Sequence, residues 1–381
     1  MFALPLIPST SPTLAESMRS CLLRAGLSRL PGAGAYVLSN PRAWLGTAYH
    51  KVLERVPALA RAGAEAAQLL DALWQAEITR LQQHAAAHAL NARFGQPQYW
   101  RGYHLVLATV RLRAAELTPL IDTSSPPAHA PAGTHREDEL TSFDGKLKGK
   151  PDLSRENEVI DFKTGSIYES EELDSSPVLR QAYVRQLQLY AYLLHDASGE
   201  WPARGRLYPI AGPPVEVNLN PADCTTAAQE AVLLLDRYNG LAASANDPTA
   251  LASPSPDTCC WCSYKMLCPA FWGSADQAWA GRQDGEAARG ALATAPRLVN
   301  AGTAYALTIA VEGGTLPHEA VSLTSLPAAV HTAVGGLAAN DSVRIVGLRR
   351  RSDGVYYATE RTVILPESQI PTITRAATGP A

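Results

Sequence analysis

No segment of this 381-residue sequence is long and apolar enough to cross a membrane. A membrane-spanning helix needs about 18 or more consecutive apolar residues, and every apolar run in the chain is shorter than that. The opening residues, MFALPLIPSTSP, also lack the basic start and long apolar core of a secretory signal peptide. These absences argue against a membrane protein, and we expect a cytoplasmic location.

The sequence also lacks a large charge of either sign. Its 33 Lys and Arg residues and 36 Asp and Glu residues give a formal net charge of −3, so no global attraction to a polyanion is expected. Contact with nucleic acid would depend on local basic segments such as GKLKGK (145–150) and GLRRRSDG (347–354). The phosphate-binding motif GxxxxGK[ST] is absent as well, which excludes a nucleotide-driven motor of that kind.

The composition is that of a folded protein with room for two domains. Hydrophobic residues make up 46% and charged residues 18% of the chain, and domains of about 100–200 residues are typical. Apolar residues recur at helical spacing through most of the first 117 residues. SPTLAESMRSCLLRAGLSRL (11–30) begins with helix-capping residues and predicts one helix that includes Cys21.

Short strands and long helices follow a breaker-rich segment at 121–135. Strand patterns occupy 137–165, and the apolar spacing then predicts a helix at 178–197. Two strands are predicted in 205–220, followed by a helix at 221–239. This order predicts an α/β fold in which a crossover helix connects strands of a mixed sheet.

The C-terminal part of the sequence alternates in the manner of β-strands. GEAARGALATAPRLVN (285–300) is predicted to be a linker. Beyond it, segments such as AYALTIAVEGG and HEAVSLTSL alternate apolar and polar residues, which predicts a small β-barrel of the OB type. We therefore expect two domains, at 1–288 and 289–381.

Two carboxylates and one lysine are predicted to meet in the strand region. In VIDFKTG (159–165), Asp161 and Lys163 point to the same face because side chains alternate along a strand. A hairpin turned at RENE would bring Asp152 of GKPDL (149–153) close to them. Carboxylates bind Mg²⁺ or Mn²⁺, such an ion lowers the pKa of water, and a lysine can orient the nucleophile. This set of groups suits phosphodiester hydrolysis.

Four short segments, in this order, resemble the RecB-like branch of the PD-(D/E)xK nuclease superfamily: GTAYH (46–50), GKPDL, VIDFKTG and RQLQLYAYLL (185–194). The resemblance spans about residues 20–272 and implies a restriction-endonuclease-like core with a helical N-terminal region. The metal ligands that it implies are His50, Asp152 and Asp161. It implies that Lys163 assists the attacking water, and that Gln186 and Tyr190, one helical turn apart, position DNA or the nucleophile.

Four of the six cysteines lie in DTCCWCSYKMLCPAFW (257–272). In a reducing compartment, clustered cysteines are more often metal ligands or catalytic thiols than disulfides. Cys259, Cys262 and Cys268 follow the spacing C-x2-C-x5-C, which supplies three ligands and leaves a fourth to come from elsewhere. Cys21 and Cys224 are the candidates for that fourth ligand.

The resemblance extends to the subgroup that contains the AddB nuclease and the CRISPR-associated exonucleases. It implies a [4Fe-4S] cluster held by Cys21, Cys259, Cys262 and Cys268, which would clamp the two ends of the nuclease domain together. Zinc in the same four thiolates is the chemical alternative. For Cys260 we expect a buried packing role. The aromatic residues expected to shield the cluster are Trp261, Tyr264 and Phe271.

The sequence therefore predicts a Mg²⁺- or Mn²⁺-dependent DNA nuclease, an exonuclease or end-acting enzyme that prefers single strands. Its pathway would be DNA repair, recombination, or phage or CRISPR defence, with a helicase or defence complex as a partner in trans. The alternative is a non-catalytic nucleic-acid-binding or scaffolding subunit whose barrel binds single strands. GLRRRSDGVYY (347–357) supplies the basic and aromatic residues for that role.

Overall fold

The computed structural model describes residues 2–118, 139–155, 157–169, 178–210, 212–352 and 354–375. The breaker-rich segment predicted at 121–135 lies outside these residues. Within the described part of the chain, no helix is both long and apolar enough to span a membrane.

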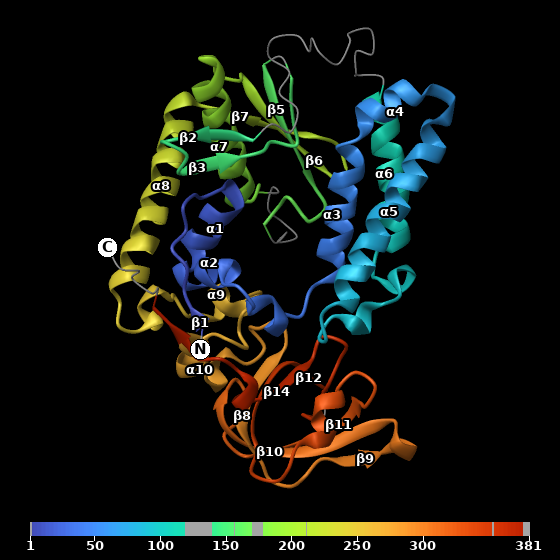
Figure 1. Cartoon of the computed structure of the whole chain (residues 1–381), viewed down its shortest axis with the longest axis vertical. Coiled ribbons are helices and arrows are strands. Elements are labelled where there is room, and N and C mark those ends of the chain that lie inside the picture. The colour runs from blue at the N-terminus through green and yellow to red at the C-terminus, as the bar shows by residue number, and fades with distance from the viewer. Residues whose placement is uncertain are drawn as a thin grey trace.

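Helices make up the N-terminal part of the chain, as the apolar spacing predicted (Figure 1). Their bounds are α1 (Pro12–Ser20), α2 (Leu22–Arg29), α3 (Pro41–Leu53), α4 (Val56–Ala62), α5 (Ala66–Ala86) and α6 (Tyr103–Leu117). The buried residues Leu45, Tyr49 and Trp74 are among those that join α3 to α6 in one hydrophobic cluster.

The helix expected at 11–30 is interrupted at Cys21. This residue has extended backbone angles, φ −165° and ψ 116°, so it ends α1 and begins α2. The prediction that Cys21 lies within a helix is therefore wrong. Both helices contribute to one hydrophobic cluster with Leu267 and Tyr238, and α1 also contacts α7 and α8. No Gly or Pro at this point of the sequence indicates the break.

A mixed four-stranded sheet forms the centre of the α/β part, in the order β4–β5–β6–β7. The parallel strands β5 and β6 are connected by the crossover helix α7, and the β4–β5 hairpin turns where RENE predicted it. The bounds are β4 (Leu153–Arg155), β5 (Glu158–Lys163), α7 (Gln181–Ser198), β6 (Arg204–Pro209), β7 (Val215–Asn218) and α8 (Pro221–Ser244). A separate hairpin of β2 (Leu140–Ser142) and β3 (Leu147–Gly149) precedes the sheet.

Helices cover both faces of this sheet. Ile160 and Phe162 of β5 join the hydrophobic cluster of α3 to α6 on one face. Val159 of β5 joins the cluster of α7 and α8 on the other face. Residues at odd positions of β5 therefore point towards α7, and residues at even positions point towards α3.

The C-terminal region forms a closed five-stranded barrel. Its ring runs β8–β10–β11–β13–β12 and back to β8, with β11 and β13 parallel. Its interior is filled by residues such as Leu292, Ile309, Leu323 and Ile345. The bounds are β8 (Glu286–Leu292), β9 (Arg297–Val299), β10 (Ala304–Gly314), β11 (Ala320–Pro327), β12 (Ser342–Arg350), β13 (Tyr356–Tyr357) and β14 (Val363–Pro366).

The linker predicted at 285–300 is wrong, because this segment contains β8 and β9. β8 pairs with both β10 and β12 and crosses the expected boundary between residues 288 and 289. A Cβ added at Gly290 would lie 1.9 Å from the carbonyl oxygen of Ala310, so the neighbouring backbone leaves no room for a side chain there. The strand sequence, EAARGAL, is largely buried and shows no regular alternation of apolar and polar residues.

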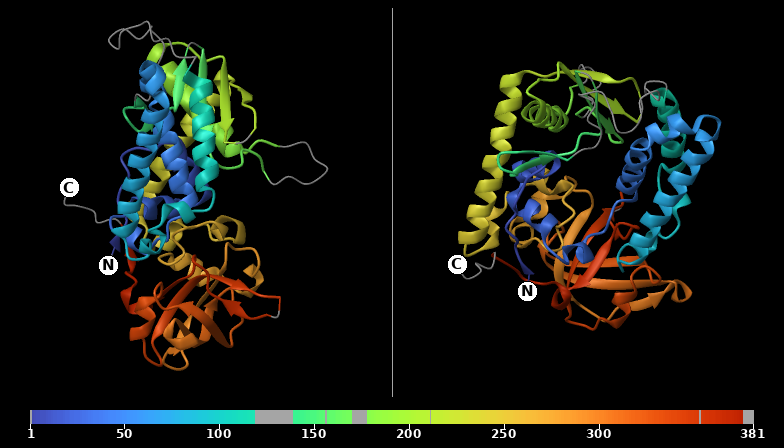
Figure 2. Two further views of the ribbon diagram at one scale, coloured as in Figure 1. Left: turned by 90° about the vertical axis from the view of Figure 1, so that its right-hand side faces the viewer. Right: turned by 45° about the horizontal axis from the view of Figure 1, so that its top comes forward.

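The cysteine-rich segment joins the barrel to the helices. It contains α9 (Pro256–Cys260) and α10 (Pro269–Ser274), and its Phe271 and Trp272 pack with Ala287 of the barrel. The barrel lies at the opposite end of α8 from the β4–β7 sheet in both views of Figure 2. Next to this junction, β1 (Phe2–Ala3) pairs in parallel with β15 (Ile373–Thr374).

Candidate active site and cysteine pocket

The strand β5 places two of the predicted site residues side by side, facing α7. Lys163 Nζ forms an ion pair with Asp161 Oδ2. The side chain of Asp161 is only 3% exposed and that of Lys163 12% exposed. Both therefore lie where solvent screens their charges little.

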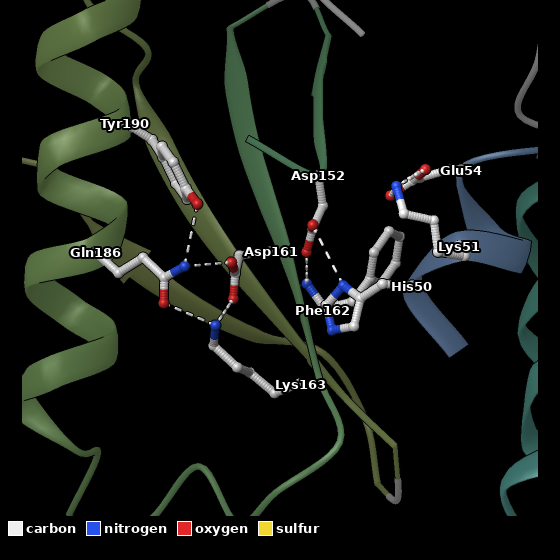
Figure 3. A network of polar contacts seen from close by, with 9 residues as sticks. All are labelled: His50, Lys51, Glu54, Asp152, Asp161, Phe162, Lys163, Gln186 and Tyr190. Carbon is white, nitrogen blue, oxygen red and sulfur yellow. Dashed lines mark hydrogen bonds and ion pairs between the residues drawn. The ribbon is translucent and has the colours of Figure 1, made fainter. Parts of the chain in front are cut away.

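A glutamine on α7 links these two residues to a tyrosine (Figure 3). Gln186 Nε2 donates to Asp161 Oδ1 at 3.0 Å and to the Tyr190 hydroxyl oxygen at 3.1 Å. Lys163 Nζ donates to Gln186 Oε1 at 2.8 Å. Because Gln186 and Tyr190 are one helical turn apart, both reach the sheet from the same face of α7.

Asp152 lies beside these residues, between β5 and α3. Its Oδ2 accepts a hydrogen bond from the backbone N–H of Phe162 at 2.7 Å, and its Oδ1 lies 3.3 Å from His50 Nδ1. Burial alone lowers the pKa of His50, but the hydrogen bond and charge of Asp152, with the charge of Asp161, raise it above its usual value. The side chains of His50 and Asp152 are 29% and 24% exposed, so this side of the cluster is open to solvent.

Burial raises the pKa of Asp161 to about 6, against the opposing effect of the Lys163 ammonium. The negative charge of Asp152 adds to the increase. A further positive charge near these carboxylates would favour their ionised forms. Carboxylate oxygens with one imidazole nitrogen are a donor set that Mg²⁺ and Mn²⁺ accept. As these residues stand, however, no three His, Cys, Asp or Glu side chains in the described chain converge closely enough to hold a metal ion.

Two motif glycines allow close packing around this cluster. A Cβ at Gly46 of α3 would lie 2.7 Å from Oγ1 of Thr164, the residue after Lys163. A Cβ at Gly149 would lie 2.5 Å from Leu193 Cδ1 and 3.2 Å from Tyr190 Cε1. Gly46 in GTAYH thus lets α3 pack against the end of β5. Gly149 in GKPDL lets the end of β3 pack against α7.

We expect Gly46→Ala to lower the free energy of unfolding by about 1–3 kcal/mol, because the added methyl group overpacks α3 against Thr164. Urea unfolding followed by circular dichroism measures this. Gly240→Ala in α8 is the matched control, since a Cβ there meets nothing within 4 Å, and it should stabilise the protein by about 0.4–1 kcal/mol. Equal stabilities for the two variants would contradict this account of Gly46.

Four cysteines line one pocket, three from the segment 257–272 and one from far away in the sequence. They are Cys21, Cys259, Cys262 and Cys268. Burial raises the pKa of the last three, that of Cys268 to about 12, so their thiols are protonated at neutral pH in the absence of a metal. Cys224 is fully buried in α8 and does not line this pocket.

Two cations that the sequence did not single out also line the cysteine pocket, and no carboxylate does. They are Arg24 on α2 and Lys265, which is 7% exposed. Lys265 Nζ donates to the carbonyl oxygen of Cys260 at 2.9 Å, and burial lowers the pKa of this ammonium. Two positive charges would partly balance the negative charge of four thiolates. In the sequence, the only indication that these two residues line the pocket is that each lies three positions from a cysteine.

Two expectations about the cysteine segment are corrected. Trp261 is 71% exposed and lies outside the cysteine pocket, so it does not shield that pocket. Cys260 is half-buried and not fully buried, and it lines a neighbouring hollow beside the barrel. Phe271 does line the cysteine pocket, and Tyr264 packs on the cluster formed by α1 and α2.

The local basic segments are engaged within the protein. In GLRRRSDG, Arg349 pairs with Asp284 at 2.9 Å and Arg350 lies over the ring of Tyr356. In GKLKGK, Lys146 pairs with Asp236 at 2.8 Å. The first of these contacts joins β12 to the residues just before β8, the second lies within the barrel, and the third joins the β2–β3 hairpin to α8.

One comparison with known proteins identifies a family. The model of the PD-(D/E)XK nuclease superfamily matches residues 9–269. The matched part contains the His50–Tyr190 cluster and all four cysteines of the pocket, and it ends before the barrel. No curated protein matches the chain.

Proposed function

Because the chain belongs to the PD-(D/E)XK nuclease superfamily, we propose that it is a metal-dependent DNA nuclease whose active site is the cluster at the end of β5. The observation that supports this best is the connected set of contacts from Lys163 through Asp161 and Gln186 to Tyr190, with Asp152 and His50 beside it. Each position holds a residue able to perform the chemistry that phosphodiester hydrolysis needs.

His50, Asp152 and Asp161 are the residues that would hold Mg²⁺ or Mn²⁺. When bound, a divalent cation stabilises negative charge on the phosphate and lowers the pKa of water. The contacts of Asp161 with Lys163, and of Asp152 with His50, would have to loosen for these donors to turn towards a shared ion. The open side of the cluster at His50 and Asp152 gives such an ion access from solvent.

Lys163 is suited to orient the attacking water. An ammonium group has three N–H donors, of which Asp161 and Gln186 take two. By rotating, the ammonium can turn one of its N–H donors towards the water or a phosphate oxygen as charge develops. Gln186 holds Lys163 and Asp161 in fixed relative positions, and the hydroxyl of Tyr190 in turn binds the Gln186 amide.

We further propose that Cys21, Cys259, Cys262 and Cys268 hold a [4Fe-4S] cluster. All four line one pocket, together with two cations, Arg24 and Lys265. The thiolates of a [4Fe-4S] cluster carry negative charge that these cations would partly balance. Zinc held by the same four thiolates is the chemical alternative.

Linear DNA, single-stranded or with accessible ends, is the substrate that we propose, in DNA repair, recombination or defence against phages. A helicase or defence complex would supply unwound strands. The five-stranded ring of the C-terminal barrel matches the OB type. Its arginines Arg349 and Arg350 contact Asp284 and Tyr356, so a purely strand-binding role for the barrel has less support than an enzyme.

End-labelled oligonucleotides test this function. Purified protein with Mn²⁺ or Mg²⁺ should degrade linear single strands, leave circular single strands intact, and lose activity when EDTA removes the metal. Labels at the 5′ and 3′ ends, compared on single- and double-stranded substrates, give the polarity and strand preference. Absence of cleavage of every DNA substrate with either metal would overturn the proposal.

A further inference from the structure

A tyrosine outside the four sequence motifs lies against the lysine of the proposed active site. Tyr183 is on α7, three residues before Gln186, so both side chains leave the same face of the helix. Lys163 Nζ lies 4.7 Å from the centre of the Tyr183 ring, which is within the range of a cation–π interaction. The helical spacing places Tyr183 towards the sheet, but only the distance between α7 and β5 brings its ring to the ammonium.

The partners of the Lys163 ammonium differ in kind. Asp161 and Gln186 bind it through directed ion-pair and hydrogen-bond contacts. If the Asp161 carboxylate held a metal ion, it would attract the Lys163 ammonium less strongly. The face of an aromatic ring attracts a cation over a broad range of orientations, so this attraction persists when the lysine turns an N–H from Asp161 towards another oxygen.

We propose that Tyr183 is a positioning residue for Lys163: its ring keeps the ammonium beside β5 while the N–H donors are exchanged between Asp161 and the attacking water. The inference rests on the proposed nuclease function, because only then does Lys163 face a water molecule during the reaction. Tyr183 acts through the lysine and needs no contact with DNA.

Replacing Tyr183 with Phe and then with fluorinated phenylalanines tests the electrostatic part of this role. Each fluorine weakens the negative potential of the ring face with little change in size. We expect Tyr183→Phe to keep kcat within about twofold, and kcat to fall stepwise by about 3- to 30-fold as fluorines are added, at constant KM. A constant kcat across the series would overturn the inference, and the series avoids large changes in packing.

Tyr183→Leu, compared with Tyr192→Leu, separates positioning from packing. Tyr192 is on the same helix, is also half-buried, and stacks on Phe143 at 5.4 Å, away from the site. Both variants lose a ring from the margin of the same hydrophobic cluster, so their stabilities should fall by similar amounts. Only Tyr183→Leu should lower kcat, and an equal loss in both variants would count against a positioning role.

Two measurements distinguish failure of this inference from failure of the proposed function. If Lys163→Ala retains full nuclease activity, the proposed site is wrong. If Lys163→Ala is inactive but kcat stays constant across the fluorinated Tyr183 series, only the role proposed for Tyr183 is wrong. Independently of activity, the Lys163 ε-methylene protons in lysine-labelled protein should show an upfield ring-current shift that Tyr183→Leu removes, and its absence would overturn the contact.

Discussion

Asp161→Asn is expected to lower the rate of DNA hydrolysis by at least about a thousandfold, because the change removes a charge that both the metal and Lys163 need. Asparagine has almost the same shape, so the fold around β5 should persist. Gln186 Nε2 can still donate to the remaining side-chain oxygen. Single-turnover cleavage of labelled DNA with saturating Mn²⁺ measures the effect.

Glu158→Gln is the matched control for Asp161→Asn. Glu158 is on the same strand, three positions before Asp161, its side chain is 6% exposed, and it pairs with Arg206 at 2.8 Å. Loss of the Glu158 charge should lower the free energy of unfolding by about 1–3 kcal/mol with little change in kcat. The two variants should therefore separate stability from activity. Cleavage by Asp161→Asn within tenfold of wild type would contradict the proposed role of this carboxylate.

Cys268→Ser is expected to abolish binding of the proposed iron–sulfur cluster. Cys268 caps α10, where its Sγ accepts a hydrogen bond from the N–H of Phe271 at 3.3 Å. Serine is a good capping residue, so the change leaves the cap in place and removes a metal ligand. The variant should lose the broad absorbance near about 400 nm that thiolate-bound iron gives, together with iron and sulfide measured after anaerobic purification.

Loss of the cluster should also destabilise the protein. Cys21 and Cys268 are more than two hundred residues apart, and a cross-link that closes such a long loop stabilises a fold by about 5 kcal/mol. Cys224→Ala is the control, because Cys224 is buried away from the pocket, and it should keep its iron. Stoichiometric zinc and no iron in the anaerobically purified wild type would replace the cluster with a zinc site.

The part of the candidate site that could be predicted from the sequence follows from local rules of strand and helix geometry. Alternation along β5 puts Asp161 and Lys163 on one face, and helical spacing puts Gln186 and Tyr190 on one face of α7. These periodicities depend on the backbone alone. The RENE turn likewise brings Asp152 next to β5, where it binds the backbone of Phe162.

Features that depend on packing between distant segments could not be predicted in this way. The break at Cys21 has no Gly or Pro to indicate it. In β8 the close backbone of β10 leaves no room for a side chain at Gly290, and the sequence EAARGAL gives no alternating pattern. The exposure of Trp261 and the contact of Tyr183 with Lys163 depend on how neighbouring elements are placed.

The parallel pair of β1 and β15 joins the two ends of the described chain. Leu4 and Ile7, which follow β1, are buried with α2, Tyr238 and Ile373 in a single cluster. A truncation before Ile373 would therefore remove a partner of β1 and uncover part of the core next to Cys21. Both β1 and β15 thus lie outside residues 9–269, the part that matches the nuclease family, yet they pack on the cluster that contains Cys21.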